Sequence, residues 1–331
     1  MPSPRQFAAP GLLLACALAQ QPQKPAPEPE LGPTIKVEVD VVNILCSVRN
    51  KQGGLVSTLG KDDFLVSEEG KPQEVKYFAR ETDLPLTIGL LVDVSRSQER
   101  LIEIERDAAA QFFSAVLRQK DLAFLISFGS EAELLQDFTG SVRLLRQALE
   151  GLRLNAGVGG IQPGPVPTMS QPRGTVLYDS VYLAAREKLR GEVGRKAIVL
   201  ITDGVDMGSR LKLEDALEAA QKADAIIYSI YYVNPSAYYR GGFGFGGVSD
   251  AALRKLSEET GGRLFRVSKK NPLPAIFEEI QKEMRSQYAL GYTPANPAKD
   301  GAFRRLDVKT RQKDLKVQAR KGYYAIKRGE S

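Results

Sequence analysis

The sequence predicts an α/β fold built on a doubly wound, mostly parallel sheet, with a small β module before it and further β strands after it. Between residues 83 and 270, apolar stretches of strand length alternate with stretches of helical spacing. One of them, residues 86–92, is an uninterrupted apolar run, as in a central strand covered on both faces. The flanking segments, residues 34–82 and 271–331, contain alternating apolar and polar residues, which are typical of strands with one solvated face.

Strands and helices of the central domain alternate as a parallel sheet requires. Strands are predicted at residues 86–92, 122–128, 197–202, 225–233 and 263–267. Helices are predicted at residues 98–118, 142–152, 176–189, 213–223 and 250–260. Because ligands of such sheets bind beyond the carboxyl ends of the strands, the loops after Val92, Leu152 and Thr202 are the places to look for a site.

The β module at residues 34–82 is too short to bury a large core of its own. In the β module, strands are predicted at residues 35–41, 44–48, 64–66 and 75–78, with turns at residues 51–54 and 69–72. In the tail, a helix at residues 274–285 is followed by strands at residues 288–292, 306–310 and 315–319. We therefore expect the β module to pack against a neighbouring part of the chain.

Residues 1–19 have the pattern of a signal peptide. Arg5 precedes an apolar run, and Ala17-Leu18-Ala19 is a small-x-small cleavage site. Residues 13–16 also resemble a lipobox ending at Cys16, but the apolar residues that follow favour simple cleavage. We expect a secreted or periplasmic protein. Lipidation at Cys16 is the alternative, and it alone would attach the protein peripherally to a membrane. Residues 20–33, rich in Pro, Gln and Glu, form a linker.

Composition narrows the possible functions. The chain has 331 residues, 43% hydrophobic and 26% charged, which suits about two globular domains. It contains no His, which excludes Ser-His and Cys-His nucleophile pairs and the usual zinc sites. The net charge of +6 comes from the tail after Lys299, where basic residues alternate with apolar ones as on the wet face of strands. We therefore expect no nucleic-acid partner.

Oxygen-bearing side chains follow two of the predicted strands. Asp93, Ser95 and Ser97 leave the first strand at alternate positions, and Asp203 follows the strand at residues 197–202. Thr175 precedes a helix. Hard divalent cations prefer oxygen ligands. Two carboxylates, three hydroxyls and waters would hold Mg²⁺ or Mn²⁺ and leave one coordination position open.

This pattern resembles the metal-ion-dependent adhesion site (MIDAS) of von Willebrand factor type A domains. The resemblance implies that Ser95, Ser97 and Thr175 bind the metal directly, and that Asp93 and Asp203 act largely through waters. It also implies that the open position accepts an Asp or Glu carboxylate from a partner protein. Nearly the whole mature chain is similar to secreted bacterial von Willebrand factor A-related proteins of the acidobacterial type, with Tyr-Ala-Leu-Gly-Tyr-Thr-Pro and Ala-Arg-Lys-Gly-Tyr-Tyr in the tail. That family implies architecture and location more than activity.

Other roles for the polar residues stay open. Ser95, Ser97 and Thr175 are suitable helix caps, a role that is compatible with metal binding. We interpret Asp206 as a residue that stabilises its turn, and Asp179 as an exposed helical residue or a support of the site. The loops at residues 155–173 and 241–247 would shape selectivity if they lay on the same rim.

The sequence therefore predicts a secreted, metal-dependent protein-binding module for adhesion or scaffolding, with no catalytic residues. One alternative is a structural component of an envelope assembly whose metal only stabilises the loops. The other is a Mg²⁺-dependent phosphatase with Asp93 as nucleophile. It is disfavoured because phosphatases of the haloacid dehalogenase type usually carry a second Asp at the position of Ser95.

Overall fold

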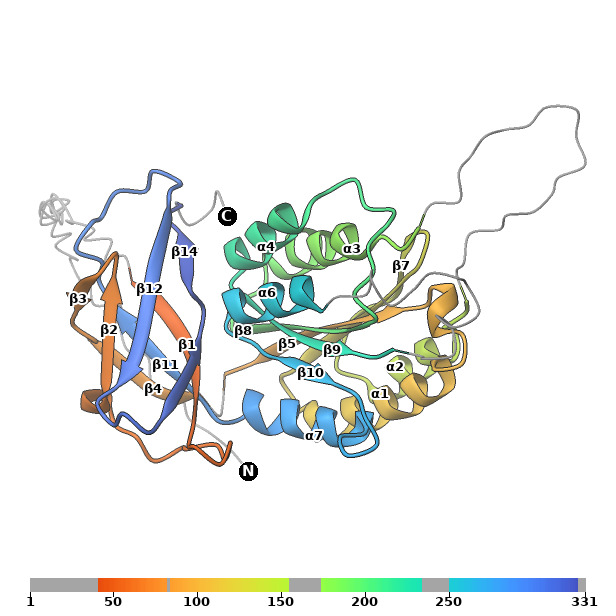
Figure 1. Cartoon of the computed structure of the whole chain (residues 1–331), viewed down its shortest axis with the longest axis horizontal. Helices are drawn as coiled ribbons and strands as arrows, with labels where there is room; N and C mark the ends of the chain where they lie inside the picture. Colours follow the sequence, from red (N-terminus) through yellow and green to blue (C-terminus); the bar gives the residue numbers. More distant parts are fainter. Residues whose placement is uncertain (1–40, 82–83, 155–173, 234–249, 327–331) are drawn as a thin grey trace, which may run out of the picture. The chain divides into compact units, whose positions relative to one another are not determined.

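The structure is a computed structural model that describes residues 41–81, 84–154, 174–233 and 250–326 (Figure 1). The predicted signal peptide, Cys16, the linker and the loops at residues 155–173 and 241–247 lie outside the described residues. None of the helices in the described ranges is long and apolar enough to cross a bilayer.

A six-stranded sheet, in the order β10-β9-β8-β5-β6-β7, forms the centre of the α/β domain. All neighbouring pairs are parallel except the pair of β6 with β7. The strands are β5 (Leu86–Asp93), β6 (Leu122–Phe128), β7 (Ala132–Thr139), β8 (Arg195–Thr202), β9 (Ala225–Tyr231) and β10 (Leu264–Arg266). The prediction of a doubly wound, mostly parallel sheet is confirmed, although the sequence did not predict the antiparallel edge strand β7.

Helices cover both faces of this sheet (Figure 1). They are α1 (Ile102–Val116), α2 (Val142–Glu150), α3 (Leu177–Leu183), which continues into η3 (Ala184–Leu189), α4 (Leu213–Lys222), α6 (Ala251–Thr260) and α7 (Leu273–Met284). The helices α1, α2 and α7 share one apolar core with the sheet, and α3, α4 and α6 share the other. Every residue of β5 is buried, because this strand is covered on both sides.

A second module of β strands combines both ends of the described chain. One sheet has the order β13-β1-β11-β4 and the other the order β14-β12-β2-β3. The strands are β1 (Val42–Arg49), β2 (Phe64–Glu68), β3 (Lys71–Gln73), β4 (Tyr77–Glu81), β11 (Gln287–Tyr292), β12 (Phe303–Thr310), β13 (Lys316–Ala319) and β14 (Gly322–Tyr324). A short 3-10 turn, η1 (Lys61–Asp63), precedes β2.

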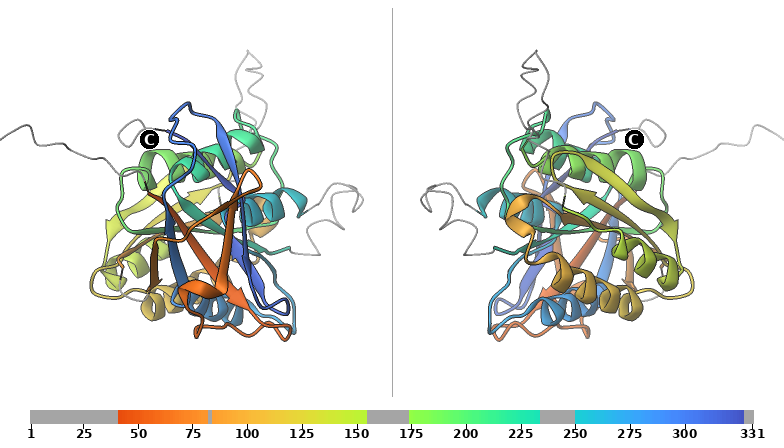
Figure 2. Two further views of the ribbon diagram at one scale, coloured as in Figure 1. Left: turned by 90° about the vertical axis from the view of Figure 1, so that its left-hand side faces the viewer. Right: turned by 90° about the vertical axis from the view of Figure 1, so that its right-hand side faces the viewer.

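The pairing within this module joins segments far apart in the sequence. Antiparallel bonds connect β1 with β11 and with β13, and β2 with β12. Figure 2 shows the orange strands of one end and the blue strands of the other side by side. The core contains Ile44, Phe64, Tyr288 and Leu290. The β strands before and after the α/β domain therefore form one shared hydrophobic core.

The turn between β2 and β3 is shorter than the sequence predicts. It consists of Glu69 and Gly70, both with positive φ, at 48° and 76°. Lys71 and Pro72 already belong to the edge strand β3. Proline is tolerated in an edge strand because its missing N–H removes no bond of a central ladder.

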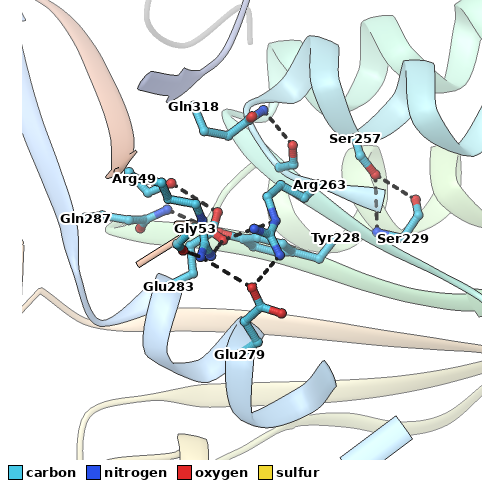
Figure 3. Close-up of polar contacts among 12 residues, drawn as sticks. Arg49, Gly53, Tyr228, Ser229, Ser257, Arg263, Glu279, Glu283, Gln287 and Gln318 are labelled. Carbon is cyan, nitrogen blue, oxygen red and sulfur yellow. Dashed lines mark hydrogen bonds and ion pairs between the residues drawn. The ribbon is translucent and has the colours of Figure 1, made fainter. Parts of the chain in front are cut away.

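A buried ion-pair cluster links β1, α7 and the start of β10 (Figure 3). The Glu283 carboxylate, fully buried on α7, accepts hydrogen bonds from Arg49 at 2.5 Å and from the Ser47 hydroxyl at 3.1 Å. Arg263 lies 3.5 Å from Glu283 and 2.7 Å from Glu279. Because Glu283 is removed from water, its charge is stable only while these partners remain beside it.

Candidate metal centre

The carboxylate of Asp93 lies at the carboxyl end of β5 and is fully buried. The backbone N–H of Ser95 donates to its Oδ1 at 2.9 Å. The hydroxyl of Thr202, at the end of the neighbouring strand β8, donates to its Oδ2 at 2.6 Å. Both oxygens therefore already accept a hydrogen bond, which fixes the side chain in one orientation.

The hydroxyls of Ser95 and Ser97 lie 3.0 Å apart. Both belong to the turn that follows Asp93 and contains the 3-10 helix η2 (Arg96–Gln98). Ser95 occupies the cap position of η2, but its side chain makes no capping hydrogen bond. Each hydroxyl keeps lone pairs beyond those used in the mutual bond, so the pair can act as oxygen ligands.

Asp203 follows β8, directly beside the end of β5. The two strands are parallel, with Val92 paired to Ile201. The Asp203 side chain is 1% exposed, and its Oδ1 accepts from the N–H of Val205 at 3.1 Å. The sheet therefore brings the two predicted carboxylates to the same end.

The charges of these two carboxylates interact. Burial, and next the neighbouring Asp203 carboxylate, raise the pKa of Asp93 to about 7, although hydrogen bonds from Ser95 and Thr202 oppose the shift. Two buried carboxylates that repel each other require a proton or a cation.

The main chain of Thr175 is attached to the loop that follows Asp203. Its carbonyl oxygen accepts from the N–H of Met207 at 3.1 Å and from the N–H of Gly208 at 3.0 Å. Only glycine permits this approach, because a Cβ on Gly208 would lie 2.1 Å from the carbonyl oxygen of Gly174. The structure thus places Thr175 beside the loop that follows Asp203.

Asp206 and Asp179 both hold this loop in place. Asp206 accepts from the Ser209 hydroxyl at 2.5 Å and from the N–H of Tyr178 at 3.2 Å. Asp179, on α3, accepts from the backbone N–H of Arg210 and of Leu211. The loop after β8 is therefore fixed to the start of α3, the helix that Thr175 precedes.

Glu105, on α1, is a further acidic residue that the sequence analysis missed. Its side chain is fully buried. Burial raises its pKa well above the ordinary value, and the carboxylates of Asp93 and Asp203 raise it further. Its position in the sequence could have indicated this burial. Glu105 lies one helical turn from Leu101 and from the buried Ala108, and therefore on the apolar face of α1.

The residues gathered here fit a hard divalent cation. The donors are carboxylate and hydroxyl oxygens, without the sulfur or imidazole nitrogen that softer metals prefer. Within the described ranges, no three His, Cys, Asp or Glu side chains are grouped to hold a metal by themselves. A metal at this place would therefore depend on the hydroxyls as well as on the carboxylates.

No family model matches the chain, and no curated protein matches its sequence. The matches are with solved structures. The structural neighbours are von Willebrand factor type A domain proteins.

Three of these neighbours show the range of the similarity. The von Willebrand factor type A protein of Catenulispora acidiphila is 11% identical, with a TM-score of 0.48, over 87% of this chain and 74% of that one. The von Willebrand factor domain of the pili tip protein Mfa5 of Porphyromonas gingivalis is 13% identical, with a TM-score of 0.42, over 61% of this chain and 95% of that one. Proximal thread matrix protein 1 of the mussel byssus is 13% identical, with a TM-score of 0.47, over 74% of this chain.

The match spans 50% of the mussel protein's own length. Another structure of that protein has a zinc-occupied MIDAS motif. These likenesses concern the fold alone.

Proposed function

We propose that this protein is a secreted module that binds a partner protein through a divalent metal, Mg²⁺ or Mn²⁺, and that it is not an enzyme. The metal would be held by Ser95, Ser97 and Thr175, with Asp93 and Asp203 acting largely through waters. Its open position would take an Asp or Glu carboxylate of the partner. The observation that carries the proposal is the convergence of Asp93, Asp203 and the serine hydroxyl pair at one end of the sheet.

The bound metal would act as a Lewis acid that attracts a carboxylate. Asp93 is oriented by Thr202, and the loop after Asp203 is bonded to the main chain of Thr175. Such preorganisation favours binding because little conformational entropy is lost when the ligand arrives.

The phosphatase alternative is less well supported. A nucleophilic aspartate needs an oxygen that can reach the substrate. Asp93 is fully buried, and both of its oxygens accept hydrogen bonds. This arrangement favours a supporting role for the carboxylate over an attacking one.

A peptide-display selection tests the proposal and does not require an identified partner. A random peptide library is bound to the protein in Mg²⁺ or Mn²⁺ and eluted with a chelator. We expect chelator-eluted peptides to be enriched in Asp or Glu, and the enrichment to be lost with Asp93→Asn but kept with Asp107→Asn, which changes an exposed residue of α1. If the folded protein yields no chelator-dependent, acid-enriched peptides, the proposed binding function is wrong.

The same selection separates the envelope-assembly alternative. A metal that only stabilises the loops would raise the melting temperature of the protein but select no carboxylate-bearing peptides.

A further inference from the structure

Glu105 is a buried carboxylate without a hydrogen-bond partner. Its side chain is 0% exposed, on the face of α1 that packs against the sheet. Neither Oε1 nor Oε2 accepts a hydrogen bond within the described part of the chain. Buried carboxylates are ordinarily paired with a cation or with several donors, because burial without a partner is strongly unfavourable.

Two further carboxylates act on Glu105 through their charge. Asp93, at the end of β5, and Asp203, after β8, are close enough for their charges to act on Glu105. Burial, and next the charge of Glu105, raise the pKa of Tyr232, after β9. Gln98, in η2, donates its Nε2 to the carbonyl of Tyr232 at 3.2 Å, but its buried Oε1 has no partner in the described part of the chain.

Buried carboxylates that repel one another require protons or a cation. The described ranges contain no grouping of three acidic side chains close enough to share one metal as ligands. Glu105 therefore lies near Asp93 and Asp203 without being placed as a third ligand beside them. A charge can still act from there, because Coulomb interaction falls only with the inverse of distance and is weakly screened inside a protein.

We infer that Glu105 is a third carboxylate of the cation site, which raises the affinity for a divalent cation through its charge and not by coordination. The inference rests on the proposed metal site and adds a residue outside the five-residue motif. Glu105 is a positioning residue in this role. Burial raises its pKa, so the carboxyl holds a proton in the metal-free protein and releases it when the cation binds. The carboxylate then makes the buried end of the site more negative, while the serine hydroxyls serve as the ligands.

Three variants separate the charge of Glu105 from its shape. Glu105→Gln keeps the size of the side chain and removes the charge, whereas Glu105→Asp keeps the charge and shortens the side chain. Glu103→Gln removes an exposed charge from the same helix and is the control. Free Mn²⁺ is measured by electron paramagnetic resonance during titration of each metal-free protein, and thermal unfolding in chelator reports whether each variant is folded.

We expect Glu105→Gln to weaken Mn²⁺ binding by roughly tenfold or more, as the loss of a buried charge interaction should. Glu105→Asp should fall between wild type and Glu105→Gln, and Glu103→Gln should bind as wild type. A folded Glu105→Gln that binds Mn²⁺ as tightly as wild type, or more tightly than Glu105→Asp, overturns the inference while the metal site stands. A folded wild type that binds no Mn²⁺ overturns the proposed metal site and this inference together.

Discussion

The hydroxyl of Thr202 donates to Oδ2 of Asp93 at 2.6 Å and accepts from the backbone N–H of Gly204 at 3.1 Å. One side chain thus joins the ends of two neighbouring parallel strands and the first residues of the loop that contains Asp203. The site is held by the sheet itself, and its geometry follows from the register of β5 with β8.

Replacing Thr202 with Val should loosen this end of the sheet. The substitution keeps the shape of the side chain, but leaves Oδ2 of Asp93 and the N–H of Gly204 without their partner. We expect the free energy of unfolding of the metal-free protein to fall by about 1–3 kcal/mol, measured by urea denaturation. Thr87→Val is the control, because Thr87 is a buried threonine of the same sheet, on β5. Equal losses in the two variants would contradict the special role of Thr202.

The stability of the metal-free protein should depend on pH through Asp93. Its folded-state pKa of about 7 lies above the ordinary value of 3.8, so between these values the folded state binds more protons than the unfolded state. Stability should therefore decrease as pH rises from 5 to 8, by on the order of 2–4 kcal/mol. Asp93→Asn should reduce this dependence and leave the part due to Glu105, whose pKa is also raised by burial. Saturating Mg²⁺ should reduce it as well. Urea denaturation across this pH range is the measurement, and a metal-free wild type that is more stable at pH 8 than at pH 5 would contradict the assignment.

The close approach of Gly208 to Gly174 should be necessary for metal binding. A Cβ at position 208 would lie 2.1 Å from a backbone oxygen, so Gly208→Ala must displace the loop that is bonded to Thr175. We expect Mn²⁺ affinity to fall by roughly tenfold, which corresponds to about 1.4 kcal/mol. Gly191→Ala adds a Cβ with no atom within 4 Å and should leave the affinity unchanged. Unaltered Mn²⁺ binding by Gly208→Ala would show that the position of Thr175 does not matter.

The ion-pair cluster around Glu283 should contribute to stability without affecting the site. Glu283→Ala leaves the guanidinium groups of Arg49 and Arg263 without their shared carboxylate. We expect a loss of about 1–3 kcal/mol in the free energy of unfolding, since the hydrogen bonds to Glu283 are lost while the partly exposed Glu279 still pairs with both guanidinium groups. Glu278→Ala, at an exposed position of the same helix, should change little. Calorimetric unfolding measures both variants, and a loss below about 1 kcal/mol for Glu283→Ala would mean that water reaches the cluster.

The central strands of the α/β domain could be predicted because a strand buried on both faces is a continuous apolar run in the sequence. The apolar run at residues 86–92 became β5, in which every residue is buried. The edge strand β7 contains no such run. It is partly exposed along its whole length, and its apolar and polar residues do not alternate strictly. An edge strand is specified by its neighbour as much as by its own residues.

Glu105 shows where residue types mislead. Ile104 of α1 is 50% exposed, whereas its neighbour Glu105 is fully buried. Charged residues are seldom fully buried, so a pattern based on hydrophobicity assigns them to the solvent side. A carboxylate is stable in a core only when another part of the chain, or a ligand, stabilises it there.

The pairing of β1 with β11 could not be predicted from either segment alone. Both segments have a strand pattern, but the register that joins Ile44 to Leu290 depends on the α/β domain between them. For the candidate site, the sequence indicated which residues would be near one another. The metal role of Asp93, Ser95, Ser97, Thr175 and Asp203 stays a prediction.

The most direct test of the central claim is calorimetric titration of Mg²⁺ and Mn²⁺ into the metal-free protein, beside Asp93→Asn and the exposed control Asp107→Asn. We expect a single saturable binding event in wild type and in the control, and its loss in Asp93→Asn. Absence of binding to the folded wild type, or equal binding by Asp93→Asn, would contradict a metal centre at the ends of β5 and β8.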